Sequence, residues 1–288
     1  MFDFNESLEQ ARLRNVRDAL LEDHGICDWT GLLIPQGRRV LADVRVREAA
    51  VLCGQLWFEG CLHSLDPTAE VRWHYSEGQD MQADTLVCTM QADARALLAA
   101  ERPCLNFLQV LSATASTTRE HVQAIAGASP NPKGCAVLDT RKTLPGLRQA
   151  QKYAVRVGGG ANQRLALWHG ILIKENHIAA AGGIAEVMRQ ALALNSGVEI
   201  QIEVESLEEL QQALEAGATN VLIDNFSLAA MREAVKLTAG RALLEVSGGV
   251  TLDQLRDIAA TGVDRISIGK LTKDIRAVDF SMRVRSAL

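Results

Sequence analysis

The sequence lacks the features that mark a secreted, membrane-embedded or nucleic-acid-binding protein. Its six cysteines are scattered and form no CxxC pair, which argues against a disulfide framework or a zinc site. No run of about 18 apolar residues is present, so no transmembrane helix is expected. The first residues lack a basic start followed by an apolar run, so no secretory signal is expected. We therefore expect a cytoplasmic protein with reduced thiols.

The overall composition is that of an ordinary globular protein. The chain has 288 residues, of which 48% are hydrophobic and 23% charged, enough for two domains or one large α/β barrel. The net charge of −5 gives no electrostatic footprint for nucleic acid. An anionic substrate is still possible, because a local cluster of arginine and lysine can override the net sign.

The second half of the chain has a regular strand–helix rhythm. Apolar strand-like runs begin near Val198, Asn220, Arg241 and Asp264, and the segments 135–140 and 170–176 look similar. Ser206 with Glu209, and Thr251 with Gln254, have the spacing of capping boxes that start helices. Repeated strand–helix units predict a parallel sheet, either open or closed into a barrel.

The first 110 or so residues follow a different pattern. A helix is predicted over about 7–23, and the alternating segments 38–48 and 69–75 indicate antiparallel strands. A long helix or helix pair is predicted over 94–126, and the Gly- and Pro-containing segment 127–134 reads as a linker. This half is therefore expected to be an α+β domain.

The segment VEIQIEVES (198–206) alternates between apolar and polar residues from Val198 to Glu205. Glu199, Gln201 and Glu203 must face one side of the strand, because strand side chains alternate. A parallel strand covered on both faces should be apolar throughout. The polar face therefore indicates a wet or ligand-filled interior, with a solvent-exposed edge strand as the alternative.

Basic residues follow two of the predicted strands. Thr140, Arg141 and Lys142 end the strand at 135–140, where parallel α/β folds place their ligands. An arginine there suits a carboxylate or phosphate. Lys174 lies in an otherwise apolar strand, so it is expected to pair with a carboxylate, bind an anion or act as a Schiff-base amine.

Acidic and small residues follow the other strands. Glu203 and Asp224 end successive strands, where paired carboxylates suit a divalent metal or sugar hydroxyls. The turns Ser247–Gly249 and Ser267–Gly269 precede helices and favour a phosphate site. The run Gly158–Gly160 is either an anion loop or a simple turn. Together these groups fit transfer of a phosphorylated sugar to a small anionic acceptor.

These residues resemble a known family, the quinolinate phosphoribosyltransferases. The matching segments are 101–106, 139–148, 152–164, 172–177, 222–226, 244–251 and 266–272. Residues 22–31 only approximate the family pattern. The resemblance implies an N-terminal α/β sandwich domain over 1–112, an incomplete α/β barrel of the type II phosphoribosyltransferase kind over 113–272, and a last helix at 273–288 that returns to the first domain.

The resemblance also implies a reaction, a cofactor and an assembly. Quinolinate and phosphoribosyl pyrophosphate would give nicotinate mononucleotide, pyrophosphate and CO2, a step of NAD biosynthesis. Mg²⁺ would arrive mainly with the substrate, and the active sites would be shared within a homodimer. No nucleic-acid or membrane partner is expected.

The resemblance assigns a role to each candidate residue. Quinolinate would meet Arg141, Gln163, Arg164 and Lys174, with Arg102 supplied by the neighbouring subunit. Lys142, beside Thr140, would serve the phosphoribosyl pyrophosphate, while Glu203 and Asp224 would hold the ribose hydroxyls and Mg²⁺. The 5′-phosphate would lie on Ser247, Gly248, Gly249, Ser267 and Gly269. Lys142, Lys174, Glu203 and Asp224 are the candidate catalytic residues.

Two positions depart from the family pattern. Gln163 stands where the family usually has histidine, and it can donate a hydrogen bond but cannot carry a positive charge. His169 replaces a usual aspartate and is given no catalytic role. Three alternatives stay open: a relative that binds ligand without activity, a Schiff-base aldolase using Lys174, and a phosphoribosyltransferase that uses nicotinate.

Overall fold

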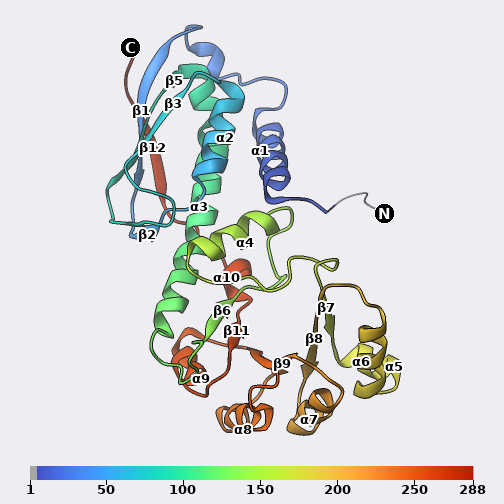
Figure 1. Ribbon diagram of the computed structural model, residues 1–288. Coiled ribbons are helices and arrows are strands. Elements are labelled where there is room, and N and C mark those ends of the chain that lie inside the picture. The colour runs from blue at the N-terminus through green and yellow to red at the C-terminus, as the bar shows by residue number, and fades with distance from the viewer. Residues whose placement is uncertain (1–4, 288) are drawn as a thin grey trace. The chain divides into compact units, whose positions relative to one another are not determined.

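The computed structural model describes residues 5–287 and divides the chain into two compact units (Figure 1). The first unit contains the chain up to Arg119, residues 143–159, and the chain from Leu271 onward. The second unit contains residues 120–142 and 160–270. In the described part of the chain, no helix has the length and apolar character needed to cross a membrane.

The first unit is built on an antiparallel sheet of four strands in the order β12-β1-β5-β3. These strands are β1 (Arg39–Val46), β3 (Glu70–Trp73), β5 (Leu86–Asp93) and β12 (Phe280–Ala287). A short pair, β2 (Ala50–Val51) and β4 (Asp80–Met81), lies beside it. The other elements are α1 (Leu8–His24), a 3-10 turn (Gly31–Leu33), α2 (Gln55–Leu65), α3 (Ala94–Ala124) and α4 (Arg148–Val157).

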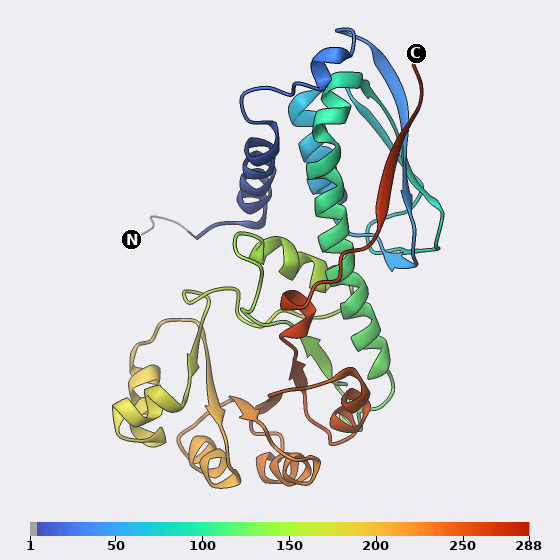
Figure 2. The same ribbon diagram turned by 180° about the vertical axis from the view of Figure 1, so that it is seen from behind.

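Alternation of side chains explains why this sheet packs against helices. Val40, Val44 and Val46 of β1 are buried, whereas Arg45 is exposed. Helices α2 and α3 lie on one face of the sheet in both views (Figures 1 and 2). The predicted antiparallel α+β character of this part of the chain is confirmed.

The long helical segment predicted over 94–126 is one helix, α3, rather than a pair. Pro103 lies inside it and supplies no backbone N–H to the helix. Leu97, Leu105, Leu108 and Leu111 are nearly or fully buried on its apolar face. Burial of that face stabilises the helix on both sides of the proline, which is why it continues.

The prediction of a C-terminal helix over 273–288 is wrong. A short helix, α10 (Lys270–Lys273), is followed by strand β12, which pairs antiparallel with β1. Phe280 and Met282 alternate with polar residues at a period of two, and they stand opposite Val46 and Val44. This period suits a strand and not a helix. The end of the chain does return to the first sheet, as expected, but as its edge strand.

The second unit is a parallel sheet of six strands in the order β6-β11-β10-β9-β8-β7. They are β6 (Ala136–Leu138), β7 (Gly170–Ile173), β8 (Glu199–Val204), β9 (Asn220–Asp224), β10 (Leu243–Ser247) and β11 (Arg265–Ser267). The helices α5 (Glu175–Ala181), α6 (Ile184–Ala193), α7 (Leu207–Glu215), α8 (Leu228–Thr238) and α9 (Leu255–Ala259) lie along the outside of the curved sheet (Figure 2).

This sheet forms the predicted open barrel. Each strand pairs in parallel with its neighbour, and β6 and β7 are the two outer strands. A single parallel bridge between Leu138 and Ala161 brings residues 160–164 beside β6. The loop before β7 therefore lines the opening of the barrel.

Of the two predicted capping boxes, one forms completely and the other only in part. The Ser206 hydroxyl accepts from the Glu209 N–H, but the Glu209 carboxylate accepts from the Glu205 N–H instead of closing the box. The box of Thr251 and Gln254 does form, around a 3-10 turn (Leu252–Gln254) that precedes α9. Both caps fix how the chain leaves the carboxyl end of a barrel strand.

Candidate functional site

The polar face of β8 points into the barrel. Strand β8 lies between β7 and β9, so the alternative of an exposed edge strand is wrong. Ile202 and Val204 are fully buried on the outer face. Gln201 and Glu203 share the inner face and contact polar groups on other strands. The alternation in the sequence therefore did identify a polar barrel interior.

Lys174 and Glu203 are brought together at the carboxyl ends of β7 and β8. The Lys174 Nζ atom lies 2.6 Å from Glu203 Oε2. The lysine side chain is 42% exposed and the glutamate side chain 11%. The lysine thus pairs with a carboxylate and can also reach a ligand in the opening of the barrel.

Two arginines of the second unit lie near enough to interact electrostatically. Arg141 follows β6, and Arg164 lies in the loop before β7, where its Nη1 donates to the Gly170 carbonyl at 3.0 Å. Burial lowers the pKa of the Arg164 guanidinium, and the positive charge of Arg141 lowers it further. Two guanidinium groups held this close repel each other, and an anionic ligand between them would relieve that repulsion.

The residues beside Arg141 form a short turn. The Thr140 hydroxyl accepts from the Lys142 backbone N–H at 3.1 Å. Lys142 is exposed at this turn, whereas Thr140 and Arg141 are half-buried. All three lie at the carboxyl end of β6, as the sequence predicts.

Asp139, the residue just before this turn, was not among the predicted site residues. Its side chain is fully buried and accepts from Asn162 Nδ2 at 2.6 Å and from the Gln163 backbone N–H at 3.0 Å. Asp139 therefore fixes the loop that carries Gln163 and Arg164. Its position in the DTRK segment, at the end of a strand, was the available signal.

The glycine run at Gly158–Gly160 forms a turn at the end of α4. Gly158 caps that helix, and a Cβ atom there would lie 2.5 Å from the Ala115 carbonyl oxygen on α3. Gly159 has a φ of +95°, which favours glycine. The described contacts of Gly158 thus favour the turn reading over the anion-loop reading.

Asp224 and the glycine turn after β10 lie side by side. Strands β9 and β10 pair with Asp224 opposite Ser247, and the Asn225 N–H donates to the Ser247 carbonyl at 3.1 Å. A Cβ atom on Gly248 would lie 2.9 Å from the Asn225 backbone nitrogen. Gly248 also has a φ of +99°. The turn Ser247–Gly249 therefore needs glycine in order to pack on the end of β9.

Ser267 ends the neighbouring strand β11. Its hydroxyl donates to the Val246 carbonyl on β10 at 3.3 Å, and its side chain is buried. Gly269 follows two residues later, directly before α10 begins. The small residues of the two predicted phosphate turns thus lie on adjacent strands.

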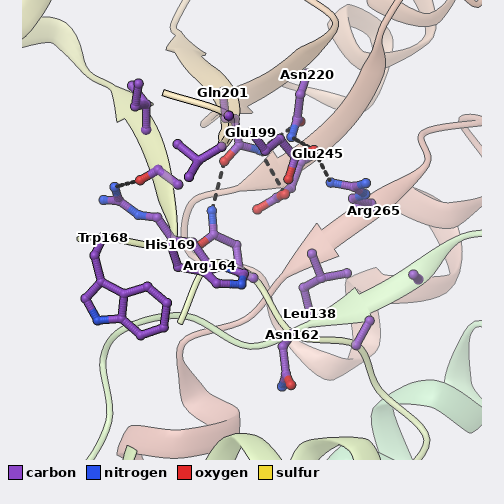
Figure 3. A pocket seen from close by; sticks show the side chains of 17 residues that line it. Leu138, Asn162, Arg164, Trp168, His169, Glu199, Gln201, Asn220, Glu245 and Arg265 are labelled. Atoms are coloured by element: carbon purple, nitrogen blue, oxygen red, sulfur yellow. Dashed lines mark hydrogen bonds and ion pairs between the residues drawn. The ribbon is translucent and has the colours of Figure 1, made fainter. Parts of the chain in front are cut away.

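A cavity of about 550 Å³ opens within the barrel of the second unit (Figure 3). It is lined by residues near the starts and middles of the strands, together with the loop before β7. Of the predicted site residues, Gln163 and Arg164 line it, whereas Lys174, Glu203 and Asp224 lie at the carboxyl ends of their strands. The cavity therefore extends the candidate site toward the amino-terminal ends of the strands.

Trp168 and His169 line the cavity from the loop that leads into β7. Their rings meet edge to face with centroids 5.6 Å apart, and His169 Nδ1 lies 3.5 Å from the Leu165 backbone nitrogen. These contacts hold the loop together.

Sequence reasoning also missed a buried carboxylate, Glu245, in the middle of β10. Its side chain is fully buried inside the barrel, and burial raises its pKa although Gln201 donates a hydrogen bond to it. A glutamate inside the LEVSGG segment gives no separate signal, because its partners come from other strands.

Arg102 belongs to the first unit, where it lies on α3. Its side chain is 54% exposed and lies 3.1 Å from the Glu101 carboxylate. Its expected role in the active site of a second subunit stays a prediction.

The acidic residues suit a metal held mainly by substrate. Glu203 and Asp224 lie on adjacent strands and on the same face of the sheet, because Glu203 pairs with Leu222. Across residues 5–287, no three His, Cys, Asp or Glu side chains gather as a metal cage. Two carboxylates suit Mg²⁺, which usually takes one or two protein carboxylates together with substrate phosphates.

An open parallel barrel with basic, acidic and glycine-rich groups at its carboxyl rim defines a class of enzymes that act on anionic ligands. Residues 28–112 match the family model described as quinolinate phosphoribosyl transferase, N-terminal domain, and residues 114–283 match the C-terminal domain model. The chain therefore belongs to the quinolinate phosphoribosyltransferase family.

Known relatives cover almost the whole chain. A probable nicotinate-nucleotide pyrophosphorylase [carboxylating] of Bacillus subtilis is 37% identical over 92% of this chain and 90% of its own length. The Mycobacterium leprae nicotinate-nucleotide pyrophosphorylase [carboxylating] is 37% identical over 93% of this chain and 95% of its own. A solved Francisella tularensis nicotinate-nucleotide pyrophosphorylase has a TM-score of 0.91 and 41% identity, covering 98% of both chains.

Proposed function

We propose that the protein transfers a phosphoribosyl group from phosphoribosyl pyrophosphate to quinolinate, with loss of CO2, to give nicotinate mononucleotide and pyrophosphate. The observation that carries the proposal is the pair of neighbouring guanidiniums, Arg141 and Arg164, in a barrel of this family. A dicarboxylate acceptor is the ligand that such a pair suits, because an arginine fork gives a carboxylate two parallel hydrogen bonds.

The acceptor binds at the opening of the barrel. Arg141 and Arg164 take the carboxylates of quinolinate, and Gln163 donates a neutral hydrogen bond. When quinolinate binds, its negative charge gives Lys174 a second partner. The lysine is then shared between Glu203 and the acceptor. This sharing keeps the lysine charge compensated before and after binding.

The donor binds across the carboxyl ends of β8 to β11. Glu203 and Asp224 accept from the ribose hydroxyls, and Ser247, Gly248, Gly249, Ser267 and Gly269 receive the 5′-phosphate through hydroxyl and backbone N–H donors. Lys142, supported by Thr140, neutralises the pyrophosphate. Glu203 and Asp224 would also hold Mg²⁺, which when bound supplies positive charge to the departing pyrophosphate.

The residues accelerate the reaction by position and charge. The ring nitrogen of quinolinate forms a bond to the anomeric carbon of the ribose as the bond to pyrophosphate breaks. The ribosylated ring then loses the carboxylate next to its nitrogen as CO2. The electron pair left on that carbon is stabilised by the adjacent cationic nitrogen and takes up a proton from water, which gives nicotinate mononucleotide. No dedicated general base is required, because no proton is removed in the transfer step.

The assembly and the compartment belong to the same proposal. A homodimer lets the exposed Arg102 reach the acceptor site of the partner subunit. All six cysteines are free thiols, four of them buried, which supports a reducing compartment such as the cytoplasm.

The test is a coupled assay with quinolinate, phosphoribosyl pyrophosphate and Mg²⁺, in which nicotinate competes as acceptor. Nicotinate mononucleotide formed from quinolinate alone supports the proposal. Product from nicotinate instead would assign the mono-carboxylate alternative. Binding without product would assign a relative that only binds ligand, and borohydride trapping of substrate on Lys174 would assign the Schiff-base alternative.

A further inference from the structure

A chain of side-chain amides crosses the interior of the barrel, and we call it the amide relay. It consists of Gln163, Gln201 and Asn220, with the carboxylates of Glu199 and Glu245 at its ends. Gln201 and Asn220 are 4% and 3% exposed, and Glu245 is fully buried. Figure 3 shows Gln201, Asn220 and Glu245 pointing toward one another at the wall of the cavity.

The relay has a fixed direction. Gln201 Nε2 donates to Asn220 Oδ1 at 3.0 Å and to Glu245 Oε2 at 2.9 Å, so both of its N–H groups are used. Asn220 Nδ2 donates to Glu199 Oε1 at 2.7 Å. The Glu199 carboxylate, which also pairs with Arg265, accepts hydrogen bonds and so fixes which end of the Asn220 amide faces it. The Asn220 oxygen in turn fixes the orientation of the Gln201 amide.

The direction of these hydrogen bonds also determines how Gln163 contacts Gln201. Because both N–H groups of Gln201 are used, only its Oε1 atom can face Gln163, and it accepts from Gln163 Nε2 at 2.9 Å. Turning the Gln201 amide over would place its oxygen against the oxygens of Glu245 and Asn220. The relay therefore orients the carboxamide of Gln163, a residue of the proposed acceptor site.

We propose that Gln201 is a positioning residue for the acceptor: held by Glu245 and Asn220, it fixes the carboxamide of Gln163 for quinolinate. The inference rests on the proposed function, because it assigns a supporting residue to the same site. Gln201 itself lies behind Gln163, in the wall of the barrel, and touches the acceptor only through it.

The first test is Gln201→Leu, which keeps the side-chain size and removes the relay. The KM for quinolinate should rise about fivefold, the size expected for one neutral hydrogen bond. The KM for phosphoribosyl pyrophosphate and kcat should change less than twofold. Gln212→Leu makes the same change at an exposed position of α7 and should leave all three constants unchanged.

A double-mutant cycle separates a positioning role of Gln201 from a general effect on packing. In a Gln163→Ala background, adding Gln201→Leu should raise the quinolinate KM less than twofold further, since the group it orients is already gone. Full additivity of the two effects would overturn the inference.

A second variant, Glu245→Gln, provides an independent test in case Gln201→Leu folds poorly. It keeps the shape but lets the Gln201 amide turn over, so the quinolinate KM should rise about twofold while the thermal midpoint does not fall. A residue with only a structural role would move stability and KM together. An unchanged quinolinate KM in both variants, with the wild type active, would overturn the inference alone, whereas an inactive wild type would count against the proposed function.

Discussion

The Lys174 amine and the Glu203 carboxylate meet across two neighbouring strands, with 2.6 Å between Nζ and Oε2. One of these residues is proposed to serve the acceptor and the other the donor. Their contact shows that the acceptor and donor parts of the candidate site adjoin. In-line transfer between two bound substrates requires this closeness.

Replacing Lys174 with methionine should raise the quinolinate KM at least tenfold. A hydrogen bond to a charged group contributes about 1.5–3 kcal/mol, and about 1.4 kcal/mol corresponds to a factor of ten. Steady-state kinetics with varied quinolinate measures the effect. Lys236→Met, which breaks an exposed ion pair with Glu233, is the matched control and should leave the kinetics unchanged. Equal effects in the two variants would contradict the prediction.

Replacing Gln163 with histidine should lower the quinolinate KM, by about tenfold at most. An imidazole can still donate to Gln201 Oε1, and in its charged form it adds a charge-assisted hydrogen bond to a carboxylate. The measurement is the quinolinate KM of Gln163→His beside the wild type. A KM that is unchanged or higher would show that the relay tolerates no ring at this position.

Replacing Gly248 with alanine should weaken binding of phosphoribosyl pyrophosphate. The new Cβ would meet the side chain and backbone of Asn225, so the turn proposed for the 5′-phosphate must shift. We expect a rise of at least tenfold in the KM for this substrate, read from initial rates. Gly217→Ala is the control, because Gly217 has a φ of +86° but open space around it. Loss of binding in both variants would point to backbone strain rather than the collision with Asn225.

Replacing Glu245 with glutamine should stabilise the protein at neutral pH. Burial raises the folded-state pKa of Glu245, so the wild type loses stability as pH rises from the unfolded value of about 4.3 through the folded value. The glutamine variant has no such loss. The gain should be present at pH 7.5 and should shrink toward zero near pH 4. Thermal or denaturant unfolding at several pH values measures it; a gain that grows on acidification would contradict the sign.

The fold was largely readable from periodicity. The alternation around Gln201 predicted the polar barrel interior, and the repeated strand–helix units predicted the parallel sheet. The C-terminal strand was missed because the resemblance suggested a helix, although Phe280 and Met282 alternate as a strand requires. A strand at the end of a chain gains its stability from a distant partner, here β1, and a local pattern does not name that partner.

Site residues could be predicted from the sequence only where a single residue carries the chemistry by itself. Arg141 and Lys174 could be picked out because charged residues at strand ends are unusual, whereas Arg164, in a loop, was assigned only through the resemblance. Asp139 and Glu245 could not be assigned, since their importance lies in contacts to Gln163 and Gln201 across the barrel. Those contacts depend on the register between strands, which one sequence does not fix. The direction of the amide relay likewise appears only when all its members are placed together.

The pairing of β12 with β1 sets an order of events during synthesis. Strand β1 precedes all the barrel strands in the sequence and β12 follows them, so the whole barrel is made before the first sheet can be completed. Until then β1 presents an open edge, which is a template for pairing with other chains. The newly made protein is thus exposed to aggregation until β12 has left the ribosome.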